Sequence, residues 1–239
     1  MYGHGSGNSK LLQRSAKLAA SCAHMSPSPK ATAVLLVRHG HVLGISPERF
    51  RGRLEIELSE RGIAEARKTA EWIARYQRPV MVYTSPLKRC RDTGGAVAAQ
   101  CEVPAEVLND LIDLDYGEWQ GRTHQEVRTE SPDLYARWHT APHLMRIPGG
   151  ESLQELVARS ADAFRWVMER HPANTIVIVA HESVNRALLL QLLDQPLSAY
   201  HTLAQDPCAI NEIDSRPDQT RVRALNQTMH LIDLPDDQH

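Results

Sequence analysis

The stretch AVLLVRHG at residues 33–40 joins five consecutive apolar residues to the polar pair Arg38 and His39. A short uninterrupted apolar run is typical of a strand that is buried on both faces. Residues 80–84 and 175–180 show the same pattern, and segments with helical periodicity lie between these runs. Buried strands that alternate with helices predict an α/β fold, a three-layer sandwich with a mainly parallel central sheet and helices on both faces.

Amphipathic patterns and capping residues mark the helices between these strands. Ser59 is a candidate N-cap for a helix that ends before Pro79. Pro86 suits the first turn of the next helix, because the N–H that proline lacks is not needed there. Residues 151–170 carry an apolar stripe at helical spacing, and residues 184–193 form a helical run after the third strand.

Residues 110–149 interrupt this alternation and are rich in Trp, His, Arg and Pro. We expect helices and loops here that cover one end of the sheet. Ligands of open α/β folds bind beyond the carboxyl ends of the strands, so this insertion is a candidate lid. Residues 209–213 predict an edge strand, which would allow pairing across the axis of a homodimer.

The composition excludes several classes of protein. A chain of 239 residues with 42% hydrophobic residues buries one substantial core. A formal net charge of −2 gives no whole-chain basic field, so neither nucleic acid nor a membrane surface is an expected partner. No run reaches the roughly 18 apolar residues of a membrane span, and we expect a soluble protein. Four cysteines without a CxxC pair favour a reducing, cytoplasmic setting.

Residues 1–30 differ in composition from the rest of the chain. They are rich in Gly and Ser, contain basic residues, and hold no Asp or Glu. Such a segment is typical of a flexible leader, either a transit peptide or vector-encoded, and the junction of His24 and Met25 favours the vector-encoded leader.

Two histidines follow buried strands, with His39 after the first and His181 after the third. The same end of a parallel sheet would bring them together. His39 and His41 form an HxH pair that suggests a metal site, but the fixed charges of Arg38 and Arg89 repel a divalent cation. Guanidinium groups bind phosphoryl oxygens instead, so we expect a phosphoryl group and neither a metal nor an organic cofactor.

A neutral imidazole attacks phosphorus when cations neutralise the phosphoryl oxygens and an acid protonates the departing alkoxide. One carboxyl group is therefore required beside the histidines. The stretch NDLIDLDYGEWQG at residues 109–121 contains four candidates, which are Asp110, Asp113, Asp115 and Glu118. The pattern by itself does not choose among them.

Several motifs occur in a characteristic order along the chain. They are RHG at 38–40, LSERG at 58–62, SPLKR at 85–89, YGEWQG at 116–121, AH at 180–181, RALL at 186–189 and NQTMHL at 226–231. Together they resemble the histidine phosphatase superfamily, in its phosphoglycerate mutase-like branch, over residues 33–231. The resemblance implies a single histidine phosphatase domain over residues 31–239.

The resemblance also implies roles for individual residues. His39 falls on the nucleophile that becomes phosphohistidine, and Asp113 falls on the proton donor, which is usually Glu in the family. Asp115 is the rival for that role, two residues further on. The shorter Asp must approach the leaving oxygen more closely than Glu would. We expect desolvation and the absence of a nearby cation to keep Asp113 protonated, so that it donates to the leaving oxygen. The phosphate pocket is implied to consist of Arg38, Arg89 and His181.

Two departures from the family pattern concern the substrate. Ile45 stands where the family often has an Asn that contacts phosphate, so either the pocket loses one donor or the loop is rearranged. Glu182 stands where many members have Gly, and a carboxylate at the rim of an anion pocket either suits a hydroxyl or amine close to the phosphate or points away from the pocket. We place Arg51, Gly52 and Glu182 as candidate substrate contacts.

The resemblance implies a metal-independent phosphoric monoester hydrolase that acts on a small phosphorylated metabolite through His39. Only 68 residues separate Asp113 from His181, fewer than in the mutases of the family, which favours hydrolysis. Two alternatives stay open: phosphoglycerate mutase-type phosphoryl transfer, and a catalytically silent module that binds a phosphorylated ligand.

Basic residues near the predicted entrance have no assigned role. They are Arg49, Arg51 and Arg53, together with His139, His143 and Arg146. We interpret them either as contacts for a second anionic group of the substrate or as a solvated rim.

Overall fold

The computed structural model describes residues 31–43, 47–216 and 219–235. Two features of the sequence lie outside these residues. They are the predicted leader at 1–30 and Ile45, whose expected effect on the phosphate pocket is therefore not tested.

The centre of the fold is a six-stranded sheet in the order β3-β2-β4-β1-β5-β6. Strand β4 pairs with β1 and β2 in parallel, β3 adds a third parallel pair, and β5 and β6 are antiparallel. The mainly parallel sheet is confirmed. The strands are β1 (Thr32–Arg38), β2 (Pro79–Thr84), β3 (Ala105–Val107), β4 (Thr175–Ala180), β5 (Ile210–Arg216) and β6 (Gln219–Gln227).

The prediction of an edge strand at residues 209–213 is wrong. Strand β5 lies between β1 and β6, because the chain turns back after Arg216 and adds β6 along its free side. The unpaired edge on which the homodimer prediction rested is thus covered, and the homodimer stays a prediction.

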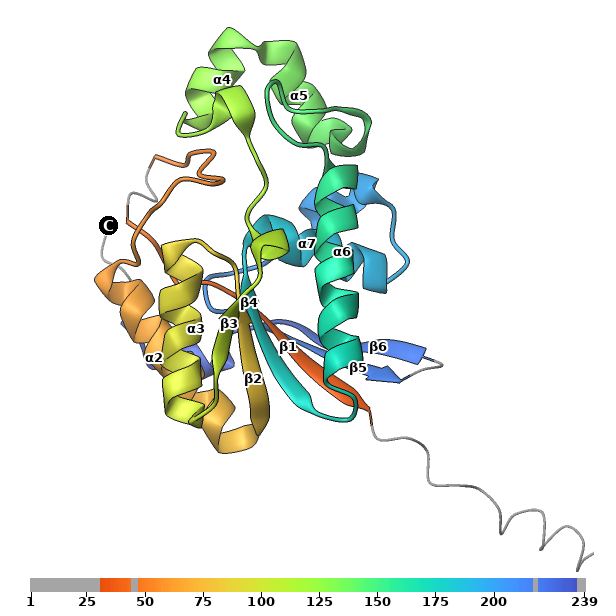
Figure 1. Cartoon of the computed structure of the whole chain (residues 1–239). Helices are drawn as coiled ribbons and strands as arrows, with labels where there is room; N and C mark the ends of the chain where they lie inside the picture. The colour runs from red at the N-terminus through yellow and green to blue at the C-terminus, as the bar shows by residue number, and fades with distance from the viewer. Residues whose placement is uncertain (1–30, 44–46, 217–218, 236–239) are drawn as a thin grey trace, which may run out of the picture. The chain divides into compact units, whose positions relative to one another are not determined.

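Helices cover both faces of the sheet, with α2 (Glu60–Tyr76) and α3 (Lys88–Cys101) on one face and α6 (Leu153–Arg170) and α7 (Glu182–Leu192) on the other (Figure 1). Side chains of β1 alternate between them. Val37 packs with α2 and α3, whereas the preceding residue, Leu36, packs with α6 and α7. This two-sided burial explains the uninterrupted apolar run and confirms the three-layer sandwich.

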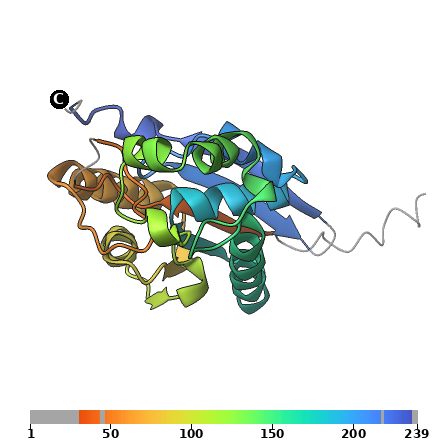
Figure 2. The same ribbon diagram turned by 90° about the horizontal axis from the view of Figure 1, so that it is seen from above.

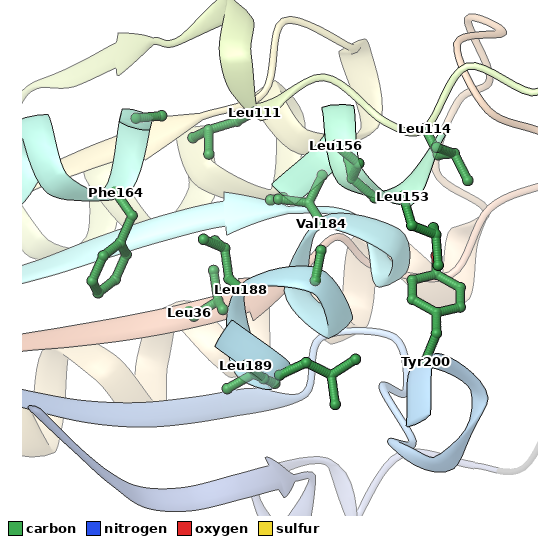
Figure 3. Packing of buried hydrophobic residues seen from close by; sticks show 14 of the residues in the cluster. Leu36, Leu111, Leu114, Leu153, Leu156, Phe164, Val184, Leu188, Leu189 and Tyr200 are labelled. Carbon is green, nitrogen blue, oxygen red and sulfur yellow. The ribbon is translucent and has the colours of Figure 1, made fainter. Parts of the chain in front are cut away.

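Apolar side chains fill the space between the sheet and helices α6 and α7 (Figure 3). Leu36 from β1, Leu156 from α6, and Val184 and Leu188 from α7 are all at most 2% exposed. Full burial of one such side chain contributes about 1.5–3 kcal/mol. This packing fixes the start of α7, which follows directly after His181.

Caps define where the helices begin. Ser59 caps α2 as predicted, since its side chain accepts a hydrogen bond from the Gly62 N–H at 3.0 Å. The predicted start of the next helix at Pro86 is wrong, because α3 begins at Lys88. Ser85 contacts His181 at 2.7 Å instead of capping the helix.

The predicted lid lies beyond the carboxyl ends of the parallel strands (Figures 1 and 2). It contains α4 (His124–Glu130) and α5 (Pro132–Thr140) with three short 3-10 turns, at Asn109–Leu111, Gly117–Trp119 and Pro142–Leu144. Its buried side chains Trp119, Val127 and Trp138 belong to the same apolar cluster as the core beneath α6 and α7. The lid is therefore packed onto the main core.

Among the described residues, no helix has the length and apolar character needed to cross a membrane.

Candidate active site

The two strand-end histidines lie side by side, as the sheet topology predicts. Strands β1 and β4 are parallel neighbours with Arg38 opposite Ala180, so the residues that follow them meet at one edge. The ring centroids of His39 and His181 are 5.3 Å apart. The two residues are only 6% and 1% exposed.

The ring of His39 is held as a neutral imidazole. Its Nδ1–H donates to the Gly40 carbonyl at 2.8 Å, and its Nε2 accepts from Arg89 Nε at 3.2 Å. Burial, with the charges of Arg89, His181 and Arg38, holds the pKa of His39 well below its usual value of 6.5. His39 therefore keeps an unprotonated Nε2 at neutral pH, as nucleophilic attack requires.

The loop that carries His39 fits closely against the start of α2. A Cβ atom on Gly40 would lie 2.6 Å from the Gly62 carbonyl oxygen. Only glycine allows this approach without displacing the backbone. The close packing fixes the Gly40 carbonyl against which His39 is oriented.

Arg89 connects the strand-end residues to the lid. Its guanidinium is 1% exposed, and it donates to the carbonyls of Gly52 at 2.7 Å and Leu54 at 2.8 Å as well as to His39. Gly52 has a φ of 48°, which favours glycine. Gly52 lines the same cleft as His39, and its carbonyl accepts from Arg89, so its role as a substrate contact stays a prediction.

Asp113 lies at the same centre. Its Oδ2 is 3.0 Å from Arg89 Nη2 and 3.5 Å from His181 Nδ1. Protonation of this carboxyl group was expected on the premise that no cation lies nearby, and that premise is wrong. The reason is geometric, because the lid segment inserts the carboxylate directly against the arginine that follows the second strand.

His181 is enclosed by polar and thiol groups. Its Nε2 lies 2.7 Å from Ser85 Oγ, and Cys90 Sγ lies 3.5 Å from the same nitrogen. Burial and the charges of Arg89 and Arg159 hold the pKa of His181 well below 6.5. A neutral His181 can donate one hydrogen bond to a phosphoryl oxygen, and it adds no positive charge to that of the buried Arg89.

Arg38 and Glu182 form an ion pair at the mouth of the site. Arg38 Nη1 lies 3.2 Å from Glu182 Oε2, and Arg186 Nη1 lies 2.6 Å from Glu182 Oε1. Arg38 also donates to the Gln205 carbonyl, while its buried Nε has no hydrogen-bond partner among the described residues. The carboxylate of Glu182 is therefore engaged by two arginines.

A cleft of about 390 Å³ opens beside His39. Its lining includes Arg38, His39, Arg51, Arg89, Asp113 and Glu182. Asp115, the rival proton donor, lines a different hollow and pairs with Arg53 at 3.1 Å. The structure thus brings Asp113, and not Asp115, to the histidines.

Other candidates from the sequence lie apart from this cleft. His41 contacts Ser59 at 2.7 Å at the start of α2. Within the described ranges, no group of three or more His, Cys, Asp or Glu side chains is arranged to hold a metal ion.

Two residues of the site were missed by the sequence analysis. Ser183 donates to Asp113 Oδ1 and accepts from the Leu114 N–H at 3.3 Å. Ser183 follows His181 by two residues and lies in the first turn of α7, so its position in the sequence could have indicated that it belongs to the site.

Arg159 has no such signal, because it lies in the middle of α6. Its guanidinium donates to three carbonyls of one lid segment, those of Asp110 at 2.7 Å, Ile112 at 2.6 Å and Asp113 at 3.1 Å. Glu151 pairs with it at 2.7 Å. This side chain holds the segment that carries Asp113.

The comparisons with known proteins agree with this geometry. The metal-independent phosphoserine phosphatase of Arabidopsis thaliana is 33% identical over 204 residues, which are 84% of each chain. Phosphoserine phosphatase 1 of Hydrogenobacter thermophilus is 31% identical over 198 residues, covering 83% of this chain and 93% of that protein.

Solved structures show the same fold. Bacillus stearothermophilus YhfR superposes with a TM-score of 0.80 at 25% identity, covering 84% of this chain and all of that chain. Mycobacterial glucosyl-3-phosphoglycerate phosphatase gives 0.77 at 24% identity, covering 83% of this chain and all of that chain. The model of the histidine phosphatase superfamily (branch 1) matches residues 34–228. The prediction of a phosphatase is confirmed at the level of the family, and the chain belongs to the histidine phosphatase superfamily, branch 1.

Proposed function

We propose that this protein hydrolyses small phosphate monoesters by way of a phosphohistidine formed on His39. One observation carries the proposal: the neutral His39 ring directs its Nε2 toward Arg89 in a cleft that also holds Arg38 and Asp113. A nucleophile, two guanidinium groups and a carboxyl group are the components that phosphoryl transfer to histidine requires.

In the first step, His39 Nε2 attacks phosphorus and the bond from phosphorus to the ester oxygen breaks. Arg38, Arg89 and His181 hold the phosphoryl oxygens, and the Asp113 carboxyl group gives its proton to the departing oxygen. The Gly40 carbonyl, 2.8 Å from Nδ1, stabilises the positive charge that develops on the ring.

The ion pair of Asp113 with Arg89 is compatible with this acid role. A substrate dianion that binds Arg89 competes with the carboxylate for the guanidinium and places negative charge beside it. The carboxyl group that leaves this ion pair can then face the departing ester oxygen.

In the second step, water attacks the phosphohistidine. The Asp113 carboxylate takes a proton from the water, the bond from phosphorus to Nε2 breaks, and inorganic phosphate leaves. His39 returns to its neutral form and Asp113 to its protonated form. Asp113 thus regains from water the proton that it gave to the ester oxygen, and the scheme uses neither a metal nor an organic cofactor.

The relatives support the substrate class. Their names describe phosphatases for phosphoserine and for glucosyl-3-phosphoglycerate, which are small phosphate monoesters. A small phosphorylated metabolite is therefore the expected partner. We also propose a reducing, cytoplasmic compartment, since Cys90, Cys101 and Cys208 are free thiols.

The experiment is phosphate release from p-nitrophenyl phosphate in excess EDTA, with wild-type protein, His39→Ala and the matched control His143→Ala. We expect wild type and His143→Ala to be active and His39→Ala to be silent. Loss of wild-type activity in EDTA would contradict the metal-independent scheme. Silence of the wild type with and without added divalent ions would contradict the hydrolase itself.

A further inference from the structure

The end of the cleft remote from His39 is walled by three histidines of the lid region. His124 comes from α4, His139 from α5 and His201 from the 3-10 turn Leu197–Thr202, and we call them the lid histidines. The ring of His139 lies 6.3 Å from that of His124 and stacks on that of His201 at 5.3 Å. The three rings thus form one continuous cluster.

The charge at this end of the cleft is positive. Glu182 is already engaged by Arg38 and Arg186. Glu48 lies 4.0 Å from His124, and its side chain is 76% exposed. The arginines that line the cleft outside the catalytic centre are Arg49, Arg51, Arg128 and Arg186. An anion is therefore the ligand that this wall attracts.

Protonation changes what the lid histidines offer to a ligand. Neutral His201 donates its Nε2–H to the Trp138 carbonyl at 2.9 Å, so its Nδ1 is an acceptor. On protonation, Nδ1 becomes a donor with a positive charge. His124 is also held at one nitrogen, since its Nδ1 lies 3.3 Å from the Tyr135 hydroxyl, and its protonated ring would carry a positive charge as well.

Burial is the main cause that lowers the pKa of each lid histidine below 6.5. The carboxylates of Glu48 and Glu182 raise these pKa values, and the guanidinium groups of Arg51, Arg128 and Arg186 lower them further. Tyr135 also faces a lid histidine, through its hydroxyl. A bound anion would reverse the shift, because it favours the charged imidazole. Anion binding here and proton uptake are therefore linked.

We propose that the lid histidines, together with Arg128, form a subsite for a carboxylate carried by the substrate at a distance from its phosphate, and that this subsite binds more tightly as the pH falls. The inference rests on the proposed function, because the phosphate of the same molecule must occupy the pocket beside His39. It restricts the substrates to phosphate monoesters that carry a second anionic group.

The structure separates the basic residues that the sequence grouped at the entrance. Arg49, Arg51 and His139 line the cleft. Arg53 pairs with Asp115 outside it, and Arg146 pairs with Glu155. His143 is not among the lining residues, which makes it a matched control for His139 in the same region of the lid.

The first test compares two series of alkyl phosphates with three to six carbons, one ending in a hydroxyl and the other in a carboxylate. The ratio of their kcat/KM values at each chain length cancels the ionisation of the phosphate and of His39. We expect the carboxylate to be preferred by about tenfold at one chain length near pH 6, the size of one charge-assisted hydrogen bond. The preference should shrink toward pH 8.

The second test applies the double variant His139→Gln, His201→Gln to both series. We expect it to lower kcat/KM for the preferred carboxylate by about tenfold and to remove the pH dependence of the ratio. His143→Gln should leave the ratio and its pH dependence as in wild type. Melting curves of both variants establish that they are folded.

The outcomes separate the two proposals. Hydrolysis of both series without a carboxylate preference would overturn the subsite and leave the phosphatase intact. A preference that does not change with pH, or that survives the double variant, would also overturn it, because the lid histidines would then take no part. Absence of hydrolysis in both series and with p-nitrophenyl phosphate would mean that the proposed function itself fails.

Discussion

The two ends of the cleft are built in different ways. At the phosphate end, Arg89 and His181 are each 1% exposed, and Arg89 makes contacts with His39, Asp113 and two backbone carbonyls. At the lid end, His139 and Arg128 are exposed and are arranged by ring contacts.

This difference assigns different tasks to the two ends. Buried donors that are fixed before the substrate arrives stabilise developing charge without reorganisation, which serves the chemical step. Exposed side chains on the lid helices select among substrates. Changes at the phosphate end should therefore reduce kcat for every substrate, whereas changes at the lid end should alter the ranking of substrates.

Replacement of the nucleophile should have the largest effect. We expect His39→Ala to lower kcat for both alkyl and aryl phosphates by at least about a thousandfold, because no other described side chain offers a neutral imidazole facing Arg89. Steady-state assays measure the loss, and circular dichroism checks the fold. Residual activity above a few per cent of wild type would remove His39 from its role.

Replacement of the acid should come next. We expect Asp113→Asn to lower kcat on alkyl phosphates by about 10²–10³-fold and on p-nitrophenyl phosphate by much less, because a good leaving group needs little protonation. Asp115→Asn is the matched control and should change both rates by less than about twofold, since Asp115 pairs with Arg53 outside the cleft. Equal losses on both substrates would instead indicate a positioning role for Asp113.

A smaller effect should follow from loosening the segment that carries the acid. We expect Arg159→Gln to lower kcat on alkyl phosphates by about tenfold, because three lid carbonyls lose their donor and Asp113 is displaced. Arg165→Gln, on the same helix with an exposed side chain, is the control. A tenfold loss that is the same on aryl phosphates would show that Arg159 does not act through the acid.

The pH profile should show the smallest change. The pKa of His39 is held well below 6.5, and His39 must be neutral to attack. Protonation therefore stops the reaction only below that value. We expect kcat/KM for p-nitrophenyl phosphate, corrected for the ionisation of the substrate, to stay flat from about pH 8 to about pH 6.5. Half-loss at pH 6.5 or above would contradict the buried, neutral nucleophile.

Local patterns explain why much of the fold was predictable. The apolar runs that became β1 and β4 are short and bounded by polar residues, and Ser59 is a strong cap. Strand β6 was missed because its alternate residues are largely exposed, so it lacks an apolar run. The start of α3 was misplaced because the residue before the helix is Leu87, which makes no side-chain cap hydrogen bond and so leaves no signal in the sequence.

The site also contains residues that the sequence predicts and contacts that it does not predict. His39 and His181 were predictable because parallel topology brings the ends of neighbouring strands together. The ion pair of Arg89 with Asp113 and the clamp by Arg159 depend on how the lid packs against α3 and α6, which no local pattern encodes.

The most direct test of the account is to trap the phosphoenzyme. Wild-type protein and His39→Ala are mixed with a substrate that carries radiolabelled phosphate, quenched in base within milliseconds, and digested to locate the label. The account predicts an acid-labile label on the peptide that contains His39, formed as fast as the first product is released, and no label in the variant. Label on another residue, or rapid turnover with no label in the wild type, would contradict it.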